Sequence, residues 1–157
     1  MRTVQFLNPE NIPLKTKLSG PIGHISIPNG DSSILSSVTL WYSDGQGVTI
    51  RSRMYEIDER TEVGVLDFVP AKATANSELR IDLSVRCKGS VEPNKLIVVE
   101  SGNAIESGIA LRLGDGSEVL IVAGAFPCSR AVRGLDKTDA QFDSEYPLER
   151  YGCVAFE

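Results

Sequence analysis

The chain contains a single histidine, His24, which limits the metal and acid–base chemistry that its side chains could support. A zinc site needs further cysteine or histidine ligands at short spacing, and a metal-binding β-barrel needs several histidines with a carboxylate. His24 lies in the segment PIGHISIP and falls on the opposite side of the expected strand from Ile25 and Ile27. This pattern predicts a strand histidine that is exposed or hydrogen-bonded to the backbone, and we expect no metal ion and no cofactor.

The three cysteines are the second source of reactive groups. Cys87, Cys128 and Cys153 are odd in number and show no Cys-x-x-Cys spacing, which is typical of free thiols in a reducing compartment. Cys128 could be a nucleophile with His24 as its base, and two nearby arginines could lower the pKa of its thiol. A cysteine at the end of an apolar strand is more often a small buried hydrophobe. We therefore expect no catalytic role for Cys128 and a core position for Cys87.

Other hydrolytic chemistries have equally little support. The chain has no Gly-x-Ser-x-Gly motif, and one histidine is a weak basis for a serine hydrolase. Paired carboxylates could be drawn from acidic residues on expected turns, namely Asp58, Glu59, Asp139, Asp143, Glu145 and Glu149. Charged residues on turns are usually only solvated, so their number favours no glycosidase. The shortage of catalytic residue types favours a binding protein over an enzyme.

Two Asp-Gly pairs between apolar runs predict β-hairpins. A three-residue loop at Asp115–Ser117 keeps apolar residues opposite one another, pairing Leu111 with Ile121, and predicts a glycine-dependent bulge. The same loop at Asp44–Gln46 pairs Leu40 with Ile50. Neither turn has the alternating oxygen ligands of a calcium loop, and neither opens the helix that a phosphate-binding glycine motif requires. We interpret both as structural turns.

The polar face of the first hairpin is the candidate binding surface. In the register above, Trp41 faces Thr49, Thr39 faces Arg51, Ser37 faces Arg53 and Leu35 faces Tyr55. This surface, Trp41, Arg51, Arg53 and Tyr55, combines residue types that are enriched in binding hot spots and that suit carbohydrate stacking or capture of an anionic group. The alternatives are a merely wet sheet face, an arginine lying over Trp41, or a register wrong by one that places Trp41 in the core.

The two hairpins also align with each other at a constant offset, with Leu40, Asp44, Gly45, Val48 and Ile50 matching Leu111, Asp115, Gly116, Val119 and Ile121. A duplicated half would explain the match. Convergence of two hairpins on one turn type is the simpler explanation.

Alternation of apolar and polar residues dominates the rest of the chain. Residues 78–88, ELRIDLSVRCK, predict a half-buried strand, and residues 95–101, KLIVVES, predict a strand buried on both faces. The run TEVGVLDFVP is expected to stop at Pro70, and Pro28-Asn29-Gly30 to form a turn. Residues 70–78 offer at most one helical turn, residues around 138–142 a short helix, and the C-terminal stretch from Asp143 is expected to be irregular.

These elements predict an all-β fold, an antiparallel β-sandwich or flattened β-barrel built from hairpins with at most one or two short helices. Residues 1–157 are expected to form a single all-β domain, since no linker or low-complexity segment divides them. The net charge of −5 disfavours nucleic acid, and no apolar run approaches the roughly 20 residues of a membrane helix. No signal peptide is evident at the N-terminus, so we expect a cytoplasmic protein.

Three functions remain open. The first is a non-catalytic binding or accessory module that acts through a sheet face or strand edge, with a protein partner or a second copy. The second is a small-molecule-binding barrel with weak hydrolase or isomerase activity, which would need a concave pocket with convergent polar groups. The third is a structural subunit of a larger assembly that pairs through strand edges.

Overall fold

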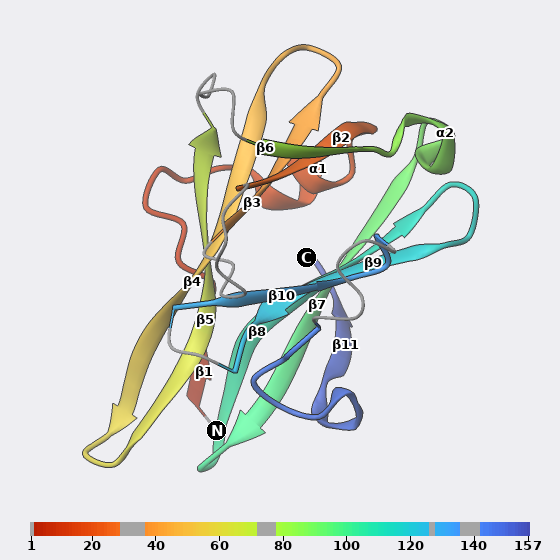
Figure 1. Ribbon diagram of the computed structural model, residues 1–157. Helices are drawn as coiled ribbons and strands as arrows, with labels where there is room; N and C mark the ends of the chain where they lie inside the picture. The colour runs from red at the N-terminus through yellow and green to blue at the C-terminus, as the bar shows by residue number, and fades with distance from the viewer. Residues whose placement is uncertain (1, 29–36, 72–77, 126–127, 136–141) are drawn as a thin grey trace.

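The protein is a β-sandwich of two sheets with two short α-helices, as the computed structural model shows for residues 2–28, 37–71, 78–125, 128–135 and 142–157 (Figure 1). In chain order the elements are β1 (Arg2–Val4), α1 (Leu14–Leu18), β2 (Ile22–Pro28), β3 (Ser37–Tyr42), β4 (Gly47–Asp58), β5 (Thr61–Ala71), β6 (Glu78–Asp82), α2 (Ser84–Cys87), β7 (Val91–Glu100), β8 (Asn103–Leu113), β9 (Glu118–Ala123), β10 (Arg130–Arg133), the 3₁₀ turn η2 (Leu148–Arg150) and β11 (Gly152–Ala155). The expected all-β sandwich is confirmed, and the described strands form two separate sheets rather than a closed barrel.

The two sheets have the same strand order. The five-stranded sheet runs β5-β4-β3-β2-β6, and the six-stranded sheet runs β10-β9-β8-β7-β11, with β1 added in parallel to β8. Each is a four-strand antiparallel meander whose fifth strand returns beside the first. This shared topology favours a duplicated half over the convergence of two isolated hairpins.

Both Asp-Gly hairpins have three-residue loops, but each loop begins one residue earlier than the apolar pattern predicts. Tyr42 N–H donates to the carbonyl of Gln46, and Leu113 N–H donates to the carbonyl of Ser117. Leu40 therefore pairs with Val48 rather than Ile50. Because side chains alternate with a period of two, a shift of two residues leaves every side chain on its predicted face. The predicted pairs of Leu35 and Ser36 lie outside the described residues.

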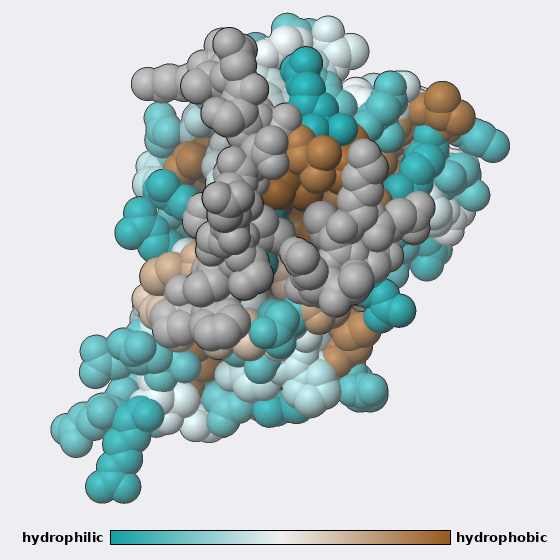
Figure 2. All heavy atoms as spheres, in the orientation of Figure 1, coloured by the Kyte–Doolittle hydropathy of each residue, from teal (hydrophilic) through white to brown (hydrophobic). Residues whose placement is uncertain are grey.

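The core between the sheets is built from the inward positions of these meanders. Leu40, Ile50, Phe68, Leu111 and Ile121 are fully buried in it and come from five different strands. A second cluster lies on the opposite face of β5, where Val63 and Val65, on the same side of the strand as Asp67, pack with Val98 and Ile105 of the other sheet. The exposed polar tip of the β4–β5 hairpin, Asp58 to Arg60, extends from the lower left of the molecule (Figure 2).

Strand β5 would present a free edge, but other segments satisfy its outward backbone groups. Leu7 N–H donates to the carbonyl of Leu66, and Phe68 N–H donates to the carbonyl of Leu7, both at 2.9 Å. Further along, both carboxylate oxygens of Glu145 accept from Gly64 N–H at 3.0 Å, and the Ser107 hydroxyl donates to Gly64 O at 2.8 Å. Burial raises the pKa of the Glu145 carboxyl. The part of the edge from Gly64 to Phe68 therefore has its outward groups occupied and is not open to pairing with another chain.

Four strand predictions need correction. The predicted strand 78–88 ends at Asp82, where the Asp82 carboxylate accepts from both the backbone N–H and the hydroxyl of Ser84, and residues Ser84–Cys87 form α2 instead. Val85 is consequently 80% exposed, although Cys87 is buried as expected. Strand β7 alternates in burial rather than being buried on both faces, and Val99 is 49% exposed.

The other two concern the ends of strands. β5 continues through Pro70 to Ala71, which an outermost strand of a sheet tolerates. The C-terminal stretch is not irregular throughout, because β11 pairs with β7. The turn expected at Asn29-Gly30 and helical segments expected within 72–77 and 136–141 lie outside the described residues.

Candidate anion-binding face

The candidate site lies on the outer face of the five-stranded sheet, where β4 presents Arg51 and Arg53. The alternate residues, Ile50 and Ser52, are buried on the inner side. Alternation along β4 thus places both guanidinium groups on the same face. Since two residues of a strand span about 7 Å, the two arginines are close enough to act on one group.

Both arginines are held by one carboxylate, that of Asp67 on β5. Arg51 pairs with Asp67 directly across the two strands, and its Nε lies 2.7 Å from Asp67 Oδ2. Arg53 Nε approaches the same oxygen at 3.2 Å. Asp67 is only 3% exposed, whereas the side chains of Arg51 and Arg53 are 40% and 53% exposed. A buried carboxylate therefore fixes two partly exposed guanidinium groups.

The terminal nitrogens of these arginines remain available. Each guanidinium uses Nε toward Asp67, and within the described part of the chain neither makes a hydrogen bond through Nη1 or Nη2. A guanidinium carries five donors in a rigid fork that matches carboxylate and phosphate oxygens. The three groups together carry one excess positive charge on a chain of net charge −5. Their arrangement can bind an anion without rearranging the ion pairs.

Tyr55 extends the row along β4. Its hydroxyl accepts a hydrogen bond of 2.8 Å from Arg2 Nη2, and the Arg2 guanidinium carbon lies 5.9 Å from the centre of the Tyr55 ring. The ring itself packs against the apolar cluster of Val63 and Val65. Arg2 thus adds a third guanidinium next to the predicted row.

Trp41 lies on the outer face, as the register predicts, yet only 9% of it is exposed. Its Nε1–H donates to the Ser26 hydroxyl at 2.9 Å, and the His24 ring stacks on it at 6.1 Å between centroids. The indole lies over Gly47, where an added Cβ would meet Trp41 Cε3 at 2.7 Å. Among the residues that the structure describes, no arginine lies over the Trp41 ring. The structure therefore separates Trp41 from the other three predicted residues.

The His24 ring contacts a side chain and not only the backbone, since its Nε2 lies 3.0 Å from Arg80 Nη2.

Cys128 is exposed, with a positive φ of 60°, and Cys153 is also exposed. Arg130 is 3% exposed and donates from Nε to the carbonyl of Ser37, and burial lowers its pKa to about 10.

Asp67 and Arg2 are the two residues of the site that sequence reasoning missed. Asp67 had a signal, because it is the only charged residue in the apolar run from Val63 to Val69, and a charge inside such a run usually has a partner. Arg2 had none, since only the tertiary structure brings the N-terminal strand beside Tyr55.

Among the residues described by the structure, no group of three or more His, Cys, Asp or Glu side chains could hold a metal ion. No helix within the described ranges is long and apolar enough to cross a membrane. No family model, no curated protein and no solved structure matches this chain.

Proposed function

We propose that this protein is a non-catalytic binding module that holds an anionic group of a protein partner on the outer face of its five-stranded sheet. Arg51 and Arg53 are the binding residues, Asp67 positions them, and Tyr55 with Arg2 borders the site. The observation that supports this proposal is the shared carboxylate, which engages Nε of both arginines and leaves their terminal nitrogens free.

The energetic argument rests on preorganisation. Ordering a long side chain on binding costs roughly 0.5–1.5 kcal/mol. The ion pairs to Asp67 already restrict both arginines, so less of this cost remains to be met when an anion binds. A carboxylate or phosphate on the partner could then accept from both guanidinium groups.

Charge also supports selectivity. Because the chain is acidic overall, an acidic partner is disfavoured over most of its surface and favoured where the arginines gather. A guanidinium remains protonated at neutral pH and supplies no general base. Its contribution here is therefore binding rather than catalysis.

The first test uses inorganic phosphate and the Nε–Hε signals of the arginines in two-dimensional NMR. We expect phosphate to move the signals of Arg51 and Arg53 in a saturable way. Arg53→Gln should weaken this binding about fivefold or more, and it leaves the Arg51–Asp67 pair to hold the buried carboxylate.

The matched control is Arg133→Gln, which removes the same charge from an exposed arginine on β10. Equal shifts at Arg51, Arg53 and Arg133 would indicate general charge screening and would contradict the proposal. So would an Arg53→Gln variant that binds phosphate as well as the parent protein.

A further inference from the structure

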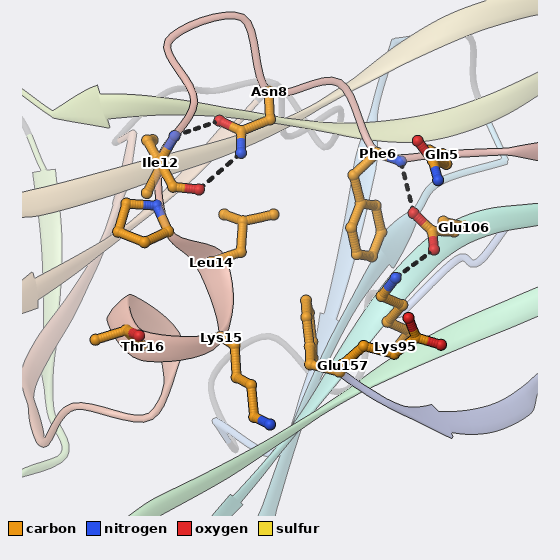
Figure 3. A pocket seen from close by; sticks show the side chains of 12 residues that line it. Gln5, Phe6, Asn8, Ile12, Leu14, Lys15, Thr16, Lys95, Glu106 and Glu157 are labelled. Atoms are coloured by element: carbon orange, nitrogen blue, oxygen red, sulfur yellow. Dashed lines mark hydrogen bonds and ion pairs between the residues drawn. The ribbon is translucent and has the colours of Figure 1, made fainter.

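A second site lies away from the arginines, in an open pocket of about 540 Å³ (Figure 3). Its walls come from α1 and the segment that joins it to β1, from β7 and β8, and from the residues that follow β11. The volume is in the range of small-molecule sites, which are mostly apolar with a few placed polar groups.

One wall of the pocket is aromatic. The Phe6 ring stacks on Phe156 with centroids 6.1 Å apart and an interplanar angle of 29°. Phe6 also contacts Phe68 of the core edge-on, with centroids 5.0 Å apart. Because Phe68 is fully buried, this contact anchors the wall to the core. A flat aromatic group or an acyl chain could pack against this fixed apolar surface.

The buried charges of the pocket are already compensated. Glu106 is 4% exposed, and its Oε2 lies 2.6 Å from Lys95 Nζ while its Oε1 accepts from Phe6 N–H at 2.8 Å. The Lys95 ammonium also lies 5.9 Å and 5.4 Å from the centres of the Phe6 and Phe156 rings. This pair therefore holds the wall in place and does not call for a charged ligand.

The cation left without such a partner is Lys15, on the opposite wall. Asn8, the neighbouring amide, is engaged within its own loop, since it exchanges hydrogen bonds of 2.8 and 2.9 Å with the backbone of Ile12. Lys15 is exposed, and although its carbonyl accepts hydrogen bonds from Ser19, its ammonium forms no hydrogen bond or ion pair within the described ranges of the chain. Figure 3 shows Lys15 and Glu157 on opposite sides of the opening. An anionic group would therefore lie on the Lys15 side.

We propose that this pocket binds a small amphipathic anion, with its apolar body against Phe6, Phe156 and Leu14 and its carboxylate, sulfonate or phosphate beside Lys15. This site is independent of the arginine face, and it gives the protein a small-molecule ligand in addition to a protein partner.

The test compares two fluorescent probes of the same shape, anionic 8-anilinonaphthalene-1-sulfonate and uncharged N-phenyl-1-naphthylamine. Both should bind with one-to-one stoichiometry. Lys15→Gln should lower the affinity for the sulfonate about fivefold, as expected for the loss of a partly exposed charge pair. It should change the affinity for the uncharged probe less than twofold. Leu14→Trp, which fills the pocket, should weaken both probes about tenfold.

Two controls keep the outcome specific. Lys17→Gln removes a charge from the same helix, but Lys17 donates to Gln46 at 2.7 Å and lies outside this pocket, so both probes should bind normally. Arg53→Gln should also leave both probes unaffected, which separates this site from the arginine face. The proposal fails if the sulfonate does not bind, if Lys15→Gln leaves its affinity unchanged, or if Lys17→Gln or Arg53→Gln weakens it equally. Near-UV circular dichroism of each variant confirms that it is folded.

Discussion

At the scale of single residues, the face of the sheet on which a side chain lies does not determine whether that side chain is buried. Trp41 points away from the core between the sheets, as alternation along β3 requires, but its indole is enclosed over Gly47 and hydrogen-bonded to Ser26. A polar sheet face is therefore not the same as a wet one. Arg51 and Arg53 on the same face remain accessible because Asp67 holds only their Nε atoms.

This distinction predicts a large loss of stability for Trp41→Ala. Truncating a buried tryptophan costs about 3–5 kcal/mol, because contacts are lost and a cavity remains. Urea unfolding followed by circular dichroism measures the change. Arg53→Gln on the same face, where the side chain is half exposed, should cost under about 1 kcal/mol. Similar small losses for both variants would show that Trp41 is a surface residue after all.

At the scale of elements, the two hairpins show how glycine sets a turn. Gly45 and Gly116 have positive φ angles of 82° and 88°, and Asp44 and Asp115 each accept a hydrogen bond from the backbone N–H two residues later. Hydrogen bonds from Ser117 hold the pKa of the Asp115 carboxyl below its ordinary value. The turns are thus equivalent in backbone, and Asp115 has the Ser117 hydroxyl as an additional donor.

We predict that Gly45→Ala and Gly116→Ala each destabilise the protein by about 1–2 kcal/mol, the cost of a left-handed conformation for a residue with a Cβ. Nothing lies within 4 Å of a Cβ added at either position, so the loss reports backbone strain alone. Thermal unfolding of both variants is the measurement. The control is Gly152→Ala, at a strand position with its nearest neighbour 3.7 Å away and no positive φ. A loss at Gly152 as large as at the two turns would contradict this explanation.

At the scale of the whole molecule, two sheets of the same strand order pack together, and the segments around Leu7 and Glu145 cover the middle of the β5 edge. Of the tyrosines, Tyr42 on β3 is buried, and Tyr146 and Tyr151, on either side of η2, are partly buried. Burial raises the pKa of Tyr146 and of Tyr151 to about 12, and burial also raises the pKa of Tyr42 beyond its ordinary value of 10.0. Ionisation of these groups is therefore coupled to unfolding.

The sign of this coupling predicts alkaline instability. A tyrosine whose pKa is higher in the folded than in the unfolded state contributes stability that is fully present below pH 10 and is lost as the pH rises toward 12. The melting temperature should fall steeply between these values, together with the rise of tyrosinate absorbance. The melting temperature of the Tyr151→Phe variant, which keeps the ring and lacks the ionisable hydroxyl, should fall less steeply with pH. A melting temperature that stays constant over this range would refute the coupling.

The sequence by itself determined the fold class, both hairpins and the face on which each residue of the arginine row lies. These follow from local rules, since alternation and Asp-Gly turns act between near neighbours, and a slip of two residues preserves the faces. It did not determine where the strand that begins at Glu78 ends. The apolar alternation continues to Cys87, but the strand stops at Asp82, whose carboxylate accepts hydrogen bonds from Ser84.

Only the tertiary structure decided which contacts the arginines make and where a pocket forms. Asp67 meets Arg51 because β4 and β5 pair in one register, and the pocket exists because Phe6, Glu106 and Phe156 converge from distant parts of the chain. It also decided that Trp41 is enclosed. Such contacts depend on how whole elements pack, and no local pattern of residues encodes that packing.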